Sequence, residues 1–138
     1  MIEGWHGEDY LILFASEEVP AATERYGIRQ RLPDHEVLGL RSWDDLIVRS
    51  ANGNTYCVPA VPIDPKYASP FKLPDSGLPL DPDTRFTGKI KWHTKPLVFG
   101  GDPGAGDNLT WVGHEQHGQL VNWWNGQYEA LRAKSGGA

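Results

Sequence analysis

Residues 45–59 read DLIVRSANGNTYCVP, and this stretch decides the fold class. Two β-prone runs, 45–50 and 55–58, flank the pair Asn52-Gly53. Asparagine and glycine suit the positive φ angles of a type I′ turn, so the stretch predicts a β-hairpin. The run 36–41 precedes the hairpin and predicts a third strand, which makes a three-stranded antiparallel meander.

The segment before the meander predicts a strand followed by a helix. Residues 9–14 are apolar and β-prone, and Ser16 with two acids behind it fits a helix N-cap. Pro20 is tolerated in the first turn, where its missing N–H does little harm. We expect the helix to reach Tyr26, with Gly27 in the left-handed conformation that commonly ends helices.

Proline dominates the segment 59–82, which holds seven of the eleven prolines. Repeated loss of backbone donors excludes a central strand or a long helix there. The segment is nevertheless too apolar for a free linker, so we expect a loop packed across the core. Its apolar residues are Val61, Ile63, Tyr67, Phe71, Leu73 and Leu78.

The last third of the chain predicts short strands and then a helix. Strands are expected at 89–93, 97–99 and 109–112, and a flexible tail at 133–138. From His114 the apolar residues recur every three to four positions, as on one face of an amphipathic helix. That face holds Leu120, Val121, Trp124, Tyr128 and Leu131. The chain is expected to be a single α+β domain over 1–138, with an antiparallel or mixed β-sheet, this helix packed on it and the long Pro-rich loop.

The net charge of −5 is unevenly distributed. Residues 1–60 carry ten acidic side chains against five arginines and no lysine, whereas 61–138 balance. Such a surface repels phosphate backbones, so nucleic acid and anionic membranes are poor partners and a basic protein is a better one. Alternatively, the acidic residues only keep the protein in solution and bind no partner. No secretion signal or long apolar run is recognisable, so we expect a cytoplasmic protein.

The stretch HEQH places His114 and His117 one helical turn apart, which raises the possibility of a metal site. The zinc hydrolase signature needs two residues between Glu and the second His, and here one is missing. A metal-assisted hydrolase using both histidines and a distant acid such as Asp102 is therefore an alternative function. We expect the stretch to be a packing helix, with no metal and no cofactor.

Other catalytic or ligand motifs are weak in this sequence. The glycine-rich run 100–108 lacks the Gly-Lys-Ser/Thr of a phosphate loop, so we expect it to connect strands 97–99 and 109–112 through Asx turns. No Gly-x-Ser-x-Gly is present. Asp44 and Asp45 are adjacent, and neighbours on a strand point to opposite faces, so the two should not form the carboxylate pair of a glycoside hydrolase. Cys57 is expected to be a buried thiol.

Six tryptophans suggest a carbohydrate- or ligand-binding module as another alternative. Large aromatic residues are more often core material in a small domain, so we expect most of the six to be buried. Trp123 and Trp124 differ by about 100° around the helix, so only one can face inward. Trp123 is the better surface candidate.

Several stretches resemble the SMI1/KNR4 (SUKH) superfamily, whose bacterial members are mostly immunity proteins. The resemblance covers about the last three quarters of the chain. It involves Leu32-Pro33-Asp34, SWDDLIVRSANGNTYCVP (42–59), PLVFGGDP (96–103) and NLTWVGHEQHGQLVNWWN (108–125). It implies an α+β fold with a central mixed sheet, no catalysis, and binding of a toxin domain to block its active site. No residue-level role carries over, because the toxin-binding surface varies within the family.

The function we expect is that of a non-catalytic cytoplasmic immunity protein, which blocks a basic cognate toxin such as a nuclease. Charge placement alone predicts the binding surface, on the acids of the meander with one aromatic anchor. The predicted partner-binding residues are Asp34, Glu36, Trp43, Asp44 and Asp45.

Overall fold

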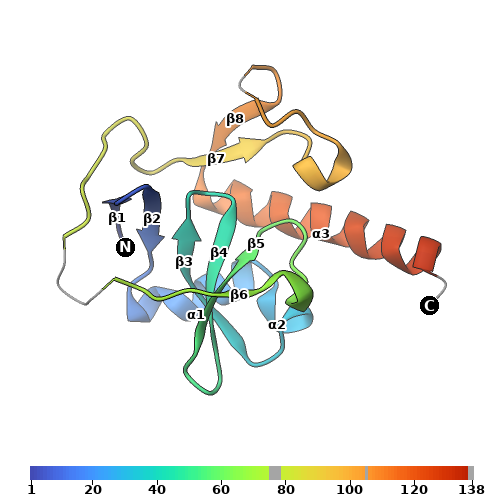
Figure 1. Ribbon diagram of the computed structural model, residues 1–138, viewed down its shortest axis with the longest axis horizontal. Helices are drawn as coiled ribbons and strands as arrows, with labels where there is room; N and C mark the ends of the chain where they lie inside the picture. The colour runs from blue at the N-terminus through green and yellow to red at the C-terminus, as the bar shows by residue number, and fades with distance from the viewer. Residues whose placement is uncertain (75–78, 105, 137–138) are drawn as a thin grey trace.

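Six antiparallel strands lie side by side in chain order, in a computed structural model that describes residues 1–74, 79–104 and 106–136 (Figure 1). The α+β fold and the predicted meander are confirmed, and the meander extends beyond the three expected strands. A strand at the N-terminus was not expected. The strands are β1 (Ile2–His6), β2 (Asp9–Leu13), β3 (His35–Arg41), β4 (Asp45–Ser50), β5 (Thr55–Pro59) and β6 (Ser69–Pro70).

The predicted hairpin is the β4–β5 pair, in register from Asp45↔Pro59 to Arg49↔Thr55. The predicted type I′ turn is wrong, because only Gly53 of the Asn52-Gly53 pair has a positive φ, of 89°. The turn closes through Gly53 N–H donating to the Ser50 carbonyl at 2.9 Å. Asn52 uses its side chain instead, whose Oδ1 accepts the Asn54 N–H at 3.1 Å.

Two consecutive left-handed residues occur instead in the β3–β4 turn, at Ser42 (φ 46°) and Trp43 (φ 64°). A bulky residue with positive φ is unusual and strained. Tertiary contacts hold the turn on both sides: Ser42 N–H donates to the Tyr10 carbonyl at 2.6 Å, and Ala60 N–H donates to the Asp44 carbonyl at 2.9 Å. This turn holds two of the predicted partner-binding residues, Trp43 and Asp44, and a third, Asp45, begins β4.

The central strands are buried on both faces, as their continuous apolar runs require. On β4, Leu46 and Val48 belong to the main core, whereas Ile47 faces a second apolar cluster with Cys57. The helices cover the main-core face. They are the 3₁₀ turn η1 (Ser16–Glu18), α1 (Val19–Arg25) and α2 (Ile28–Arg31).

The predicted first helix is confirmed, with Pro20 in its first turn and Gly27 left-handed at φ 62° beyond its end. Ser16 as N-cap is wrong. The helix begins with the 3₁₀ turn, and the cap residue is Ala15. The Ala15 N–H donates to the Glu18 carboxylate at 2.8 Å, so the acid supplies the part of a capping box that satisfies the N–H of the cap residue itself.

The Pro-rich segment 59–82 packs across the sheet as predicted, with η2 (Pro65–Tyr67) and the two-residue β6 within its described part. Val61 and Ile63 pack in the main core, and Phe71 and Leu73 against the second cluster. Tyr67 is exposed, contrary to expectation, and η2 buries none of its three residues. Leu78 lies outside the described residues.

A second sheet pairs β7 (Ile90–His93) with β8 (Leu109–Val112) above the β3–β4 turn (Figure 1). The strand predicted at 97–99 is wrong: Leu97–Phe99 is the 3₁₀ turn η3. Pro96 precedes these three residues, and Gly100 ends them with a left-handed φ of 88°, so no extended pairing develops. The glycine-rich run therefore joins η3 to β8, and Gly104 N–H donates to Asp102 Oδ1 in the expected Asx turn.

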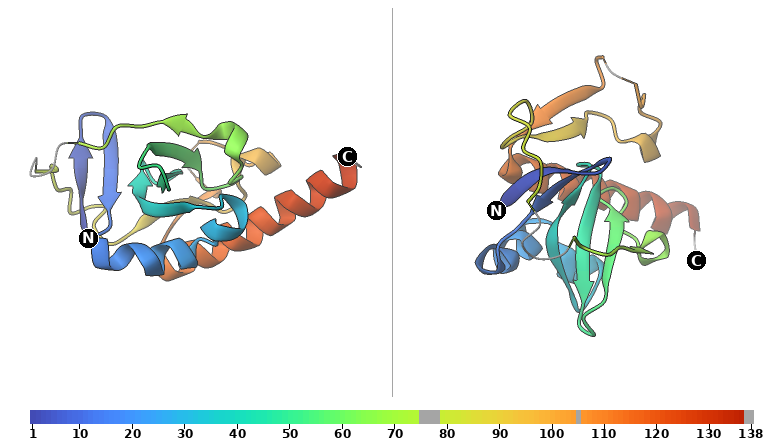
Figure 2. Two further views of the ribbon diagram at one scale, coloured as in Figure 1. Left: turned by 90° about the horizontal axis from the view of Figure 1, so that it is seen from below. Right: turned by 60° about the vertical axis from the view of Figure 1, so that its left-hand side comes forward.

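The C-terminal helix α3 (His114–Gly136) packs on the main core, and Figure 2 shows α1 and α3 along one side of the sheet. Trp123 is 57% exposed and Trp124 packs against the core, as predicted. The apolar face ends before Leu131, which is exposed. The tail expected at 133–138 is helical to Gly136, and residues 137–138 lie outside the described part. None of the described helices is long and apolar enough to span a membrane.

Candidate functional site

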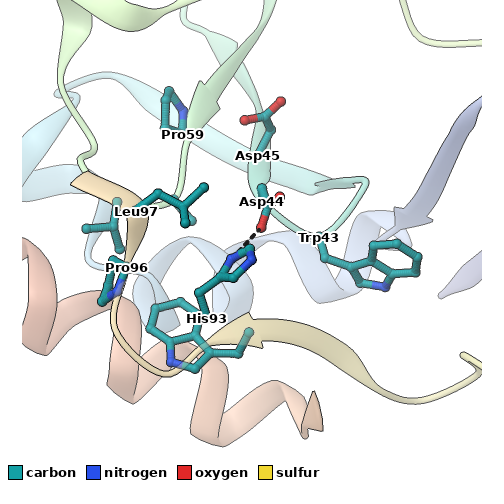
Figure 3. Close-up of a pocket in the computed structure, with 10 residues that line it drawn as sticks. Trp43, Asp44, Asp45, Pro59, His93, Pro96 and Leu97 are labelled. Carbon is teal, nitrogen blue, oxygen red and sulfur yellow. Dashed lines mark ion pairs between the residues drawn. The ribbon is translucent and has the colours of Figure 1, made fainter. Parts of the chain in front are cut away.

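A pocket of about 180 Å³ opens where the β3–β4 turn, the end of β5 and the end of β7 meet (Figure 3). Each contributing segment ends there because a turn or a proline interrupts its strand: the turn after Arg41, Pro59 on β5, and Pro96 after β7. The lining residues are Trp43, Asp44, Asp45, Pro59, Ala60, Val61, Trp92, His93, Pro96 and Leu97.

Asp44 and His93 face each other inside this pocket. The Asp44 carboxylate lies 3.9 Å from Nδ1 of His93, and the imidazole is buried whereas the Asp44 side chain is 53% exposed (Figure 3). A separation of 3.9 Å is too long for a hydrogen bond, so both Asp44 oxygens retain lone pairs for another donor. Asp44 therefore presents an accessible negative charge at the rim of an otherwise largely apolar pocket.

Asp45 is the next residue, and its carboxylate points away from His93 in Figure 3. The expected divergence of the two neighbouring acids is therefore visible, although both residues border the same pocket. Burial raises the pKa of Asp45, and the negative charges of Asp44 and Asp9 raise it further against the opposing effect of Arg41. Asp9 is ion-paired with Arg41 at 3.1 Å, so Asp44 and Asp45 are the acids that border the pocket.

The pocket walls are held by two asparagine side chains, of which Asn125 is fully buried. Asn125 on α3 accepts the Ile63 N–H at 2.7 Å and donates to the Ala60 carbonyl at 2.7 Å, so the helix fixes the wall that follows β5. Asn108 accepts the Lys95 N–H at 2.7 Å and donates to the Lys95 carbonyl at 3.0 Å. The second amide fixes the chain between β7 and η3, and the pocket is therefore built in advance of any ligand.

Trp43 forms a wall of the pocket and does not protrude, since it is only 7% exposed. Tyr10 stacks on its indole with ring centres 4.8 Å apart, and Lys91 Nζ lies 5.3 Å from the ring centre. The indole is therefore already engaged by an aromatic ring and by a cation. The protruding apolar side chains at this site are instead Leu97 and Val98, at 46% and 47% exposed.

The five predicted partner-binding residues separate into two groups. Trp43, Asp44 and Asp45 come together at the pocket, whereas Asp34 and Glu36 lie at the other end of β3, roughly 20 Å away at ~3.3 Å per residue. Glu36 is engaged there, because its carboxylate accepts from Arg49 at 2.7 Å. The structure therefore concentrates the predicted surface on the β3–β4 turn.

The two histidines considered for metal binding lie against the core. His117 is fully buried, and its Nδ1 is hydrogen-bonded to Tyr26 Oη at 2.7 Å. Burial lowers the pKa of His117 to about 3, with smaller contributions from His114 and Arg25. Asp102 is exposed in its own loop. Within 1–74, 79–104 and 106–136, no three His, Cys, Asp or Glu side chains gather as metal ligands do.

Four of the six tryptophans belong to the core or pack against it, as expected: Trp5, Trp43, Trp92 and Trp124. The two exposed ones, Trp111 and Trp123, lie on different elements, β8 and α3. Trp111 stacks on Phe86 with ring centres 5.2 Å apart, and Trp123 meets Trp124 edge to face. Cys57 is buried in a strand, as predicted.

Sequence reasoning missed the residues that complete the pocket, above all His93, Pro96 and Leu97. They lie far from Asp44 in the chain, and no local pattern links them to it. The exposed pair Leu97-Val98 was interpreted as part of a strand, which hid its surface role. Comparison of the chain with family models, with curated proteins and with solved structures finds no match.

Proposed function

We propose that this protein is a non-catalytic immunity protein of the cytoplasm, which binds a basic toxin domain at the β3–β4 end of its sheet and blocks it. The observation that carries the proposal is the preformed pocket with the half-exposed Asp44 carboxylate at its rim. The resemblance of the pocket's own segments, 42–59 and 96–103, to immunity proteins supports the same function.

The surface has the anatomy of a protein-binding site. Leu97 and Val98 supply exposed apolar area beside the pocket, and the carboxylates of Asp44 and Asp45 border it. Protein interfaces combine an apolar centre with a polar rim, and complementary charge speeds their association. A volume of about 180 Å³ is also smaller than the ~300–1,000 Å³ of pockets that enclose drug-sized ligands. It suits a single side chain of a partner.

The Asp44–His93 pair also invites a catalytic interpretation, as an acid and a base in one pocket. Among the described residues that line the pocket, none carries a hydroxyl or thiol that the imidazole could activate. Burial of the imidazole against prolines and Leu97 is better suited to shaping the pocket. Binding is therefore the function we favour.

A protection assay tests the proposed function in cells. The protein would be co-expressed with the basic protein encoded by the neighbouring reading frame, because an immunity gene ordinarily lies beside its toxin gene. We expect the wild-type chain to restore growth, and an Asp44→Lys/Asp45→Lys variant to fail while folded and equally abundant. Toxicity that is undiminished by the wild-type chain contradicts the proposal.

A further inference from the structure

We infer that the pocket receives one arginine side chain of the partner, with its guanidinium on the Asp44 carboxylate and its methylene stem along the apolar walls. The inference rests on the proposed function and specifies the chemistry that this site recognises. The argument uses the size and the walls of the pocket and the half-exposed Asp44 carboxylate at its rim.

The walls suit a long side chain with an apolar stem. Pro59, Pro96 and Leu97 line the pocket with saturated carbon, and Leu97 points towards the space between His93 and Asp44 in Figure 3. Arginine buries its methylene groups on such surfaces while its charged head stays near water. The half-exposed Asp44 at the rim lies where that head would emerge.

The charge at the rim favours a guanidinium over an ammonium. Asp44 has two carboxylate oxygens that the 3.9 Å contact with His93 does not occupy, and a guanidinium can donate to both at once. A guanidinium is also more weakly hydrated than an ammonium, so its entry into a largely apolar pocket costs less. The positive charge of Lys91 already lies 5.3 Å from the Trp43 ring centre, so the carboxylate, and not this ring, binds the partner's cation.

An NMR titration with amino-acid amides tests this inference without any partner protein. N-acetyl-arginine amide should give saturable shifts of the Asp44, Ala60 and His93 backbone amides, with a Kd on the order of millimolar for so small a ligand. N-acetyl-citrulline amide has nearly the same shape without the charge, and should bind about fivefold or more weakly. N-acetyl-lysine amide should also bind more weakly than the arginine compound.

Two pairs of variants locate the binding. Asp44→Asn should reduce arginine binding to the level of citrulline, and Asp34→Asn, at the far end of β3, should leave it unchanged. Leu97→Trp should block the pocket without changing its charge, whereas Val98→Trp alters an equally exposed neighbour outside the lining. If Asp44→Asn disturbs the turn, the comparison of Leu97→Trp with Val98→Trp still tests the inference.

The inference is overturned if arginine gives no saturable shifts at these amides, if citrulline or lysine binds as tightly, or if Leu97→Trp leaves binding intact. Its failure is distinguishable from failure of the proposed function. If charge reversal at Asp44 still abolishes protection in cells but arginine amide does not bind, the function stands and the arginine assignment falls.

Discussion

The Asp44 carboxylate faces the His93 imidazole across 3.9 Å, although Asp44 lies in a turn of the large sheet and His93 ends a strand of the small one. The pocket therefore exists only while the two sheets are docked. Asn125 on α3 fixes one wall of that pocket, because its side chain binds the segment after β5 through Ala60 and Ile63. Loss of its amide should therefore affect both stability and the pocket.

Asn125→Leu should lower the free energy of unfolding by about 3 kcal/mol. The variant leaves the Ile63 N–H and the Ala60 carbonyl buried without their partner, and each such group costs ~1–3 kcal/mol. Urea denaturation at 25 °C measures the change. Gln127→Leu, on the exposed side of the same helix, is the matched control and should change stability by less than ~0.5 kcal/mol. Equal losses of stability in the two variants would argue against a stabilising role for the Asn125 hydrogen bonds.

Much of the fold was predictable because its elements carry local periodicity. The hairpin 45–59, the strand at 109–112 and the helix from His114 show alternation or helical spacing that packing then preserves. The failures occur where tertiary contacts override local preference. Ser42 and Trp43 take the left-handed conformation without glycine or asparagine, because hydrogen bonds and the Tyr10 stack hold them there.

The site was predictable only in part. Charge placement pointed to Asp44 and Asp45, which the structure places at the edge of one pocket, and their role in binding stays a prediction. Charge placement could not show that Asp34 and Glu36 lie far from this pocket. They are at the opposite end of β3, and only the length and direction of that strand reveal the distance. The far wall comes from His93, Pro96 and Leu97, which only the docking of the second sheet brings to the turn.

His117 should make the protein lose stability in mild acid. Its folded pKa is lowered to about 3 by burial, below the ~6.5 of an unfolded histidine. The unfolded chain therefore takes up a proton first as the pH falls below ~6.5, and stability is lost progressively down to about pH 3. At pH 5 this group alone should account for ~2 kcal/mol relative to pH 7.5.

His117→Phe should flatten that part of the pH profile, whatever its effect on stability at pH 7.5. The measurement is a set of urea melts between pH 4.5 and 7.5 on both proteins. His6→Phe makes the same substitution at an exposed position and should keep the acid loss of the parent. A His117→Phe profile as steep as that of the wild type would show that the buried imidazole does not cause the loss.

Cys57 should be nearly inert to thiol reagents in the folded protein. Burial raises the pKa of its thiol to about 11, with Arg41 opposing the shift, so little thiolate is present at pH 8. Reaction with Ellman's reagent should be at least ~100-fold slower than in urea. The double variant Cys57→Ser/Ala51→Cys places a thiol on the exposed hairpin turn and should react rapidly when folded. Fast reaction of native Cys57 would mean that β5 opens readily.

The affinity for the toxin that the protection assay identifies, measured by isothermal titration calorimetry at 50 and 200 mM salt, tests the central claim most directly. Asp44→Lys/Asp45→Lys should weaken binding by at least about 100-fold and flatten its salt dependence, whereas Asp34→Lys/Glu36→Lys should change it by less than about fivefold. Unchanged affinity of the first variant, or equal losses in both, would contradict docking at the β3–β4 end.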